Sequence, residues 1–160
     1  MLAGVVFIVD ELVHLTNPIP FLDVAFVVAM LLVLVGILGF HALQKGSYGL
    51  MGLSGFYAVV AGIAGQVVGL AFLLSGSTSL LWLVSAAAFV LMVGFVLYGF
   101  ATFRAGVLPR WCGAALIVTF PLAFVFGTYA YFWLGFIWLA LGYVLWTRRR
   151  VATEQSTRVR

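Results

Sequence analysis

Apolar residues fill this chain in six stretches, separated by short segments rich in glycine, proline and serine. Segments of that composition are typical of tight connections between antiparallel helices. Apolar runs that approach about 20 residues are long enough to cross a bilayer as helices. The pattern therefore predicts six helices, at about residues 1–16, 21–43, 50–74, 79–103, 111–126 and 129–146.

Two of these helices need a separate argument about length. Residues 111–146 as one helix would be about 54 Å long, whereas the hydrocarbon core of a bilayer is about 30 Å thick. We therefore divide this stretch near Gly127, with a tight turn between two short helices. The first helix, at residues 1–16, rises only about 22 Å. We expect it to be tilted, shallow, or cut short by a start site assigned too far downstream.

Composition identifies the solvent of these helices. Hydrophobic residues make up 66% of the 160 residues and charged residues only 8%, whereas soluble domains carry about 25% charged residues. The mean hydropathy is +1.26. Such a chain cannot cover itself with a wettable surface, so we expect an all-α, polytopic transmembrane bundle. The net charge of +4 comes without a basic stripe, which argues against nucleic acid as a partner.

The placement of the basic residues predicts the orientation of the bundle. All eight fall on the second connection, the fourth connection and the C-terminal tail: Lys45, Arg104, Arg110, Arg148, Arg149, Arg150, Arg158 and Arg160. Because short cytoplasmic loops concentrate Lys and Arg, we expect a multi-pass plasma-membrane protein with both termini cytoplasmic. Residues 1–147 then form the bundle. Residues 148–160 form a basic cytoplasmic tail, which we expect to anchor the last helix and to end in a short disordered segment.

A weak internal repeat is visible at a spacing of 60 residues. The segments LGFHALQKG (38–46) and YGFATFRAG (98–106) share three identical positions, and each ends a helix that runs toward the basic side. Parallel duplication of a helical hairpin would produce this pattern, as it does in some transporters.

Small residues in the third helix predict how the helices pack. Ala61, Gly65 and Gly69 recur every four residues, and small residues at this spacing let helix backbones approach closely in lipid. We expect this face to pack inside the bundle; a seam between two copies of the chain is the alternative.

Two isolated polar side chains are further candidates for function. Gln66 lies near mid-membrane, where an amide needs a partner. We favour an interhelical hydrogen bond over a role in lining a substrate path. His41 could ligate a pigment, such as a haem or a chlorophyll magnesium, although a solvated histidine is the simpler interpretation. His41 and His14 lie most of a membrane apart, so they cannot share one haem.

The segment DELVH holds the remaining candidate chemistry. Asp10 and Glu11 precede His14 by four and three residues, so on a helix both carboxylates can flank one imidazole. With Asp23 they form a candidate site for one zinc-like ion. A di-iron centre would need further Glu and His residues. The favoured interpretation is a helix end wetted at the outer boundary, where a charge costs less than at the membrane centre.

The fourth connection, AGVLPRWCG at residues 105–113, resembles a loop of small, uncharacterised bacterial and archaeal integral membrane proteins. In these proteins a Gly-x-Leu-Pro-Arg-Trp segment opens a helix, and the first helix ends in a histidine near a proline. The matching residues are Gly106, Leu108, Pro109, Arg110 and Trp111, with His14 and Pro18 matching more loosely. The resemblance implies a six-helix membrane protein and no established activity. The chain departs from it in the short first helix with its two acids.

These observations favour a non-catalytic integral membrane protein, an accessory or structural subunit that packs through its helices in a larger membrane assembly. We expect no enzymatic activity, because the chain has no P-loop, dinucleotide fingerprint or nucleophile elbow. The expected partners are the lipid bilayer, bound lipid, and other membrane subunits or a second copy, with no cofactor. Two alternatives stay open: a small transporter or channel, and a metal- or pigment-binding protein.

Overall fold

A computed structural model describes the backbone of residues 1–16, 22–126 and 130–158, and side chains over residues 1–13, 24–122, 125 and 130–147. These residues form six α-helices and no strand in the described ranges. The helices are α1 (Leu2–Thr16), α2 (Leu22–Gln44), α3 (Gly49–Leu74), α4 (Leu81–Ala105), α5 (Arg110–Phe126) and α6 (Ala130–Arg158). The predicted all-α bundle of six helices is therefore confirmed, and every helix end but one lies within two residues of its predicted position.

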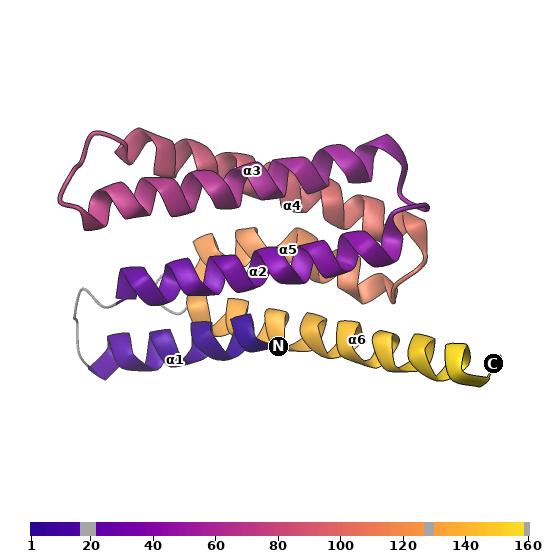
Figure 1. Cartoon of the computed structure of the whole chain (residues 1–160). Helices are drawn as coiled ribbons and strands as arrows, with labels where there is room; N and C mark the ends of the chain where they lie inside the picture. Colours follow the sequence, from indigo (N-terminus) through magenta and orange to yellow (C-terminus); the bar gives the residue numbers. More distant parts are fainter. Residues whose placement is uncertain (17–21, 127–129, 159–160) are drawn as a thin grey trace.

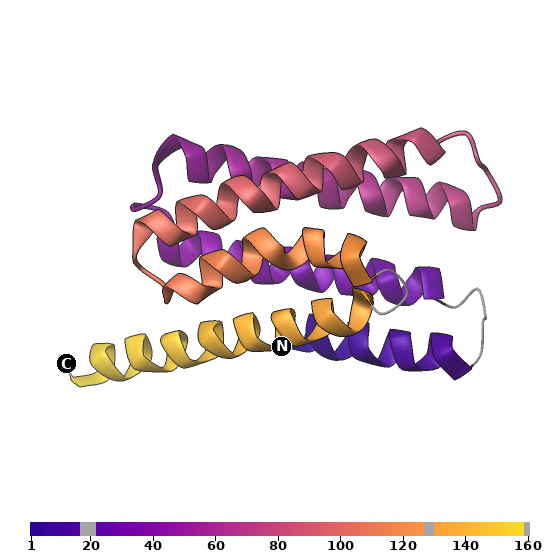
Figure 2. The same cartoon turned by 180° about the vertical axis from the view of Figure 1, so that it is seen from behind.

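The helices pack in three layers (Figure 1). The α3–α4 hairpin forms one layer, α2 and α5 lie in the middle, and α1 and α6 form the third. Seen from behind, α5 lies between α4 and α6 and contacts both (Figure 2). The α2–α3 and α4–α5 connections lie at the same end of the bundle as the C-terminus. Exposed Lys45, Arg104 and Arg110 lie at this end, which we call the basic end.

Four helical segments are long and apolar enough to cross a membrane: Val24–Gln44, Gly49–Leu74, Leu81–Ala105 and Ala130–Thr147. The apolar segment Arg110–Leu122 of α5 is shorter, and α1 has only 15 residues. Large apolar side chains cover the outside of the bundle, among them Tyr57, Phe89 and Phe136. Such a surface is suited to lipid rather than water. The protein is an integral membrane protein.

The α3–α4 hairpin is held together by glycines at a spacing of seven residues. Gly55 lies on Tyr98, Gly62 on Leu91 and Gly69 on Val84. Successive contacts are therefore seven residues apart on both helices, which run in opposite directions. A Cβ on Gly62 would lie 2.8 Å from the backbone nitrogen of Leu91. Repeats of seven residues keep one seam of a helix facing its neighbour. The backbones can approach this closely only because no side chain stands between them.

This seam corrects one predicted packing residue. Gly65 and Gly69 lie in it: a Cβ on Gly65 would be 2.8 Å from that of Ala87. Ala61, in contrast, is exposed on the outer face of α3. Residues four apart are rotated by about 40° relative to each other around a helix axis. Three residues at this spacing therefore cannot all face the seam, and Ala61 is the one that lies outside it.

The first helix packs against the last in a similar way. Met1 lies against Gly142 of α6, and Ile8 lies against Gly135. A Cβ on Gly4 would lie 2.7 Å from the backbone nitrogen of Leu139. Because α1 begins beside Gly142, it covers only the part of α6 that lies away from the basic end (Figure 1). With 15 residues, α1 is short, as predicted.

The C-terminal tail differs from its prediction. The backbone of α6 stays helical through Arg158, whereas we expected a short disordered end after the last crossing. Residues 148–158 contain no glycine or proline, so no residue in this range breaks the helix where the apolar segment ends.

Candidate functional site

Gln66 is held inside the α3–α4 seam. It is buried, and its Nε2 donates a hydrogen bond to the backbone carbonyl of Val84 at a donor–acceptor distance of 3.2 Å. Gly69 packs against the same residue of α4. The amide is thus used to join two helices, in a place where backbones are in close contact. A substrate path along this residue would require the hairpin to separate.

Aromatic and polar side chains gather at the basic end of α2, α3 and α4. His41 stacks on Phe56 with ring centroids 4.0 Å apart, and its Nδ1 forms a hydrogen bond with the Tyr48 hydroxyl. Tyr48 contacts Tyr98 edge-to-face at 5.9 Å. We call these four residues the basic-end cluster. It joins three helices and the α2–α3 connection through ring contacts.

The hydrogen bond with Tyr48 limits how His41 could bind a metal. Burial raises the pKa of the Tyr48 phenol, and the neighbouring Tyr57 raises it further, so the phenol stays protonated near neutral pH. With Nδ1 engaged by Tyr48, only Nε2 of His41 remains to bind a metal, and it can do so only in the tautomer in which Nδ1–H donates to the Tyr48 oxygen. Phe56 covers one face of the imidazole ring. His41 as a pigment ligand stays a prediction, and it would have to bind through Nε2.

Two further polar side chains, those of Gln44 and Thr102, are buried near this end, as is the hydroxyl of Tyr98 in the cluster. Their polar side-chain atoms have no hydrogen-bond partner within the described parts of the chain. Gln44 follows His41 by three residues on α2, and Thr102 follows Tyr98 by one turn on α4. Buried polar groups in proteins are nearly always satisfied, so this region can accept water or a small polar molecule. It is the candidate site that sequence reasoning missed, apart from His41.

The candidate metal site is only partly within the described residues. Asp10 is 6% exposed and Glu11 is 1% exposed, whereas the side chains of His14 and Asp23 lie outside the described ranges. No group of three His, Cys, Asp or Glu residues that could hold a metal occurs among the described side chains. The expected wetted helix end is wrong for Asp10 and Glu11, because α1 turns both residues into the bundle instead of toward water.

The loop that carries the family resemblance builds a helix connection. Gly106 ends α4 in the left-handed conformation, with φ of +65°, which glycine adopts without strain. Leu108 is buried, and the Cys112 N–H donates to the Pro109 carbonyl at 2.9 Å. The Arg110 guanidinium lies 5.9 Å from the centre of the Phe103 ring. These contacts stabilise a turn, and none of them forms a reactive site.

Comparison with known proteins adds no assignment: no protein-family model, curated protein or solved structure matches the chain. Its function must therefore be argued from its own residues.

Proposed function

We propose that this protein is a non-catalytic integral membrane protein that acts as an accessory or structural subunit, packing through its helices in a larger membrane assembly. The observation that supports the proposal is the hydrogen bond that Gln66 makes between α3 and α4. Its amide lies in the glycine seam and bonds to Val84, which favours a role in helix packing over a role in a substrate path. Transport past this residue would require the α3–α4 seam, the most extensive helix contact among the described residues, to open.

The outer face of α3 offers a surface for a partner helix. Ala61, Ala64 and Ala71 are exposed there, so a second helix could approach the α3 backbone closely. Small residues are the usual contact points between helices in lipid, where helix association has no hydrophobic drive. The same face could pair with a second copy of the chain or with a different subunit.

Copurification tests this proposal. A tagged chain extracted in mild detergent is expected to carry one or more membrane subunits, or a second copy, at a fixed ratio measured by quantitative mass spectrometry. Ala61→Leu combined with Ala64→Leu should reduce that ratio, because leucine holds the partner backbone away. Ala140→Leu, at an exposed alanine of α6, is the matched control and should leave it unchanged. A solitary chain that conducts ions or solutes in vesicles would contradict the proposal.

In the proposed orientation both termini are cytoplasmic, and the protein lies in the plasma membrane. The collection of Lys45, Arg104 and Arg110 at one end supports this orientation through the positive-inside rule. We expect a thiol reagent that cannot cross the membrane to label Ser47→Cys and Arg158→Cys from the same side. Thr78→Cys, in the α3–α4 connection, should be labelled from the other side. The buried Cys112 is replaced by alanine in all three variants. Labelling of residues 47 and 158 from opposite sides would overturn the orientation.

A further inference from the structure

Two polar side chains, those of Gln44 and Thr102, are buried in the core at the basic end of the bundle. Gln44 is 0% exposed and Thr102 is 1% exposed. Neither the Gln44 amide nor the Thr102 hydroxyl has a hydrogen-bond partner in the parts of the chain that the structure describes. In contrast, the equally buried Thr119 donates to the Ala115 carbonyl of its own helix at 2.6 Å, a bond that threonine commonly makes within a helix. The Gln44 amide and the Thr102 hydroxyl therefore remain available to a ligand.

Gln44 and Thr102 end two matching stripes of buried residues. The stripe on α2 is Val33, Ile37, Phe40 and Gln44, and the stripe on α4 is Leu91, Phe95, Tyr98 and Thr102. Both stripes have spacings of four, three and four residues, which keep them on one face of a helix. The members of both stripes that precede the two polar residues belong to one core cluster. Gln44 and Thr102 therefore face the same core from two helices.

Ring contacts place the two polar groups at a similar depth. His41 on α2 stacks on Phe56, and the Phe56 ring lies 6.4 Å from the ring of Tyr98 on α4. Gln44 follows His41 by three residues and Thr102 follows Tyr98 by four, which correspond to rises of about 4.5 Å and about 6 Å. Because α2 and α4 both run toward the basic end (Figure 1), the amide and the hydroxyl lie one turn beyond these rings on the same side.

The core is covered at this end, and α2 and α4 leave room between them. Leu108 of the α4–α5 connection is buried in the same cluster. The charged side chains described nearby, those of Lys45, Arg104 and Arg110, are all exposed. The backbones of α2 and α4 make little direct contact with each other, so a molecule between their polar groups does not have to displace a packed helix pair.

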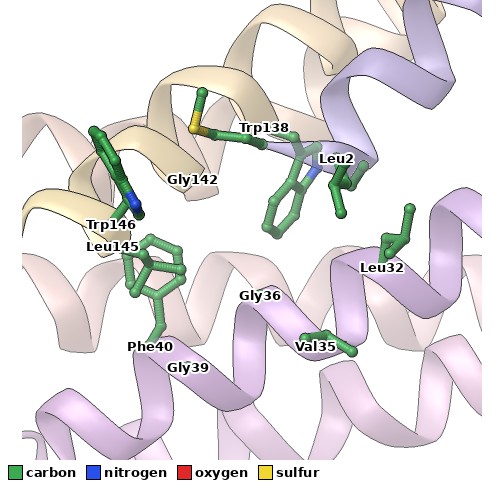
Figure 3. A pocket seen from close by; sticks show the side chains of 12 residues that line it. Leu2, Leu32, Val35, Gly36, Gly39, Phe40, Trp138, Gly142, Leu145 and Trp146 are labelled. Atoms are coloured by element: carbon green, nitrogen blue, oxygen red, sulfur yellow. The ribbon is translucent and has the colours of Figure 1, made fainter. Parts of the chain in front are cut away.

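The chemistry of the two groups favours water as the ligand. Both groups are neutral, and each can donate and accept a hydrogen bond. A buried charged ligand would need a buried counter-charge, whereas an apolar ligand would leave both groups unsatisfied. Buried water typically makes about three hydrogen bonds to polar groups that otherwise lack partners. The pocket between α2 and α6 differs (Figure 3), because its described lining residues include neither an amide side chain nor a hydroxyl.

We propose that Gln44 and Thr102 form a buried site for water, in which one or more water molecules bridge α2 to α4. The bridge joins two helices that make little direct contact and satisfies both polar groups. The site lies within one chain, so it does not depend on the accessory role proposed above and needs neither a partner subunit nor a second copy.

X-ray footprinting of the full chain in lipid nanodiscs tests this site. Radiolysis converts water into hydroxyl radicals, which oxidise the aromatic rings beside it, and mass spectrometry locates the added oxygen. We expect oxidation of Tyr98, which is fully buried one turn from Thr102. Phe95, also buried and one turn earlier on the same stripe, lies beside the rings of Phe120 and Trp138. It is the internal control and should stay unmodified.

Two variants separate bound water from other sources of oxidation. Gln44→Met combined with Thr102→Val keeps the approximate size of both side chains, removes their hydrogen-bonding groups, and should abolish the oxidation of Tyr98. Thr119→Val is the matched control and should leave this oxidation unchanged, because its own helix already satisfies the Thr119 hydroxyl. Helix content by circular dichroism identifies a double variant that fails to fold. Thr102→Val alone then replaces it and should reduce the oxidation of Tyr98.

Three results would overturn the site. The first is equal oxidation of Tyr98 in the polar-to-apolar variant and the unaltered chain. The second is an unmodified Tyr98 in the unaltered chain, which would indicate a dry core in which Gln44 and Thr102 bond to each other. The third is equal oxidation of Phe95 and Tyr98, which would mean that bulk water enters the whole core.

Discussion

Gly62→Leu is expected to separate α3 from α4 and to destabilise the folded bundle by about 3 kcal/mol or more, at the upper end of the range for overpacking. The reason is geometric. A Cβ at this position would already lie 2.8 Å from the Leu91 backbone nitrogen, and backbone atoms cannot move aside as a flexible side chain can. The measurement is the free energy of unfolding in mixed micelles, obtained by titration with a denaturing detergent.

The neighbouring exposed position supplies the control for this variant. Ala64 lies two residues further along α3 and is exposed. In the chain purified without a partner, Ala64→Leu adds a side chain of the same size to the exposed face of α3, and it should change the free energy of unfolding by no more than about 0.5 kcal/mol. If Gly62→Leu were as stable as Ala64→Leu, the close approach of α3 and α4 would be refuted.

Tyr98→Ala is expected to have a comparable effect, with a loss of about 3–5 kcal/mol in the free energy of unfolding. Tyr98 is 0% exposed, and its ring contacts Tyr48 and Phe56. Its removal would leave a cavity where the basic-end cluster joins α4 to α3. The same detergent titration measures this loss, and the fluorescence of the remaining aromatic residues would report loosening of the cluster.

Tyr98→Phe separates the ring from the hydroxyl. The hydroxyl has no hydrogen-bond partner within the described ranges, and removal of an unsatisfied buried polar group is close to neutral or stabilising. We therefore expect Tyr98→Phe to stay within about 1 kcal/mol of the unaltered protein. A loss as large as that of Tyr98→Ala would mean that the hydroxyl, and not the packing of the ring, supports the cluster.

The helices could be predicted from the sequence because the membrane imposes a simple rule. Long apolar runs must form helices there, since every backbone polar group needs a partner within the segment, and glycine, proline and serine mark the connections. The one wrong helix end shows the limit of this rule. The apolar run ends near Trp146, but α6 continues to Arg158, because the edge of the membrane is not itself a helix breaker.

Helix contacts were harder to predict than helices. Gly55, Gly62 and Gly69 are visible in the sequence at a spacing of seven, whereas a four-residue spacing favours Ala61, Gly65 and Gly69, of which only Ala61 lies outside the seam. Burial of Asp10 and Glu11 was also missed. A depth argument places these residues along the membrane axis, but it cannot say which side of α1 faces α6. Which helices pack side by side depends on tertiary structure, and the pattern of residues within one helix does not determine it.

The contacts of the basic-end cluster could not be predicted from the sequence for the same reason. His41 and Tyr48 lie seven residues apart, across the end of α2, and their hydrogen bond depends on how the chain turns between helices. Taken alone, a tyrosine beside a helix connection is typical of an anchor at the membrane interface. A useful signal was the pair of spacings His41 to Gln44 and Tyr98 to Thr102, which place polar groups one turn apart at the same end of two helices.

The pairing of α1 with α6 has a consequence for biosynthesis. The glycine contacts of α1 lie on α6, although four helices separate α1 from α6 along the chain. During translation α1 must therefore wait in the membrane, incompletely supported, until α6 has been made. A chain halted before α6 would leave α1 without the helix that it contacts most.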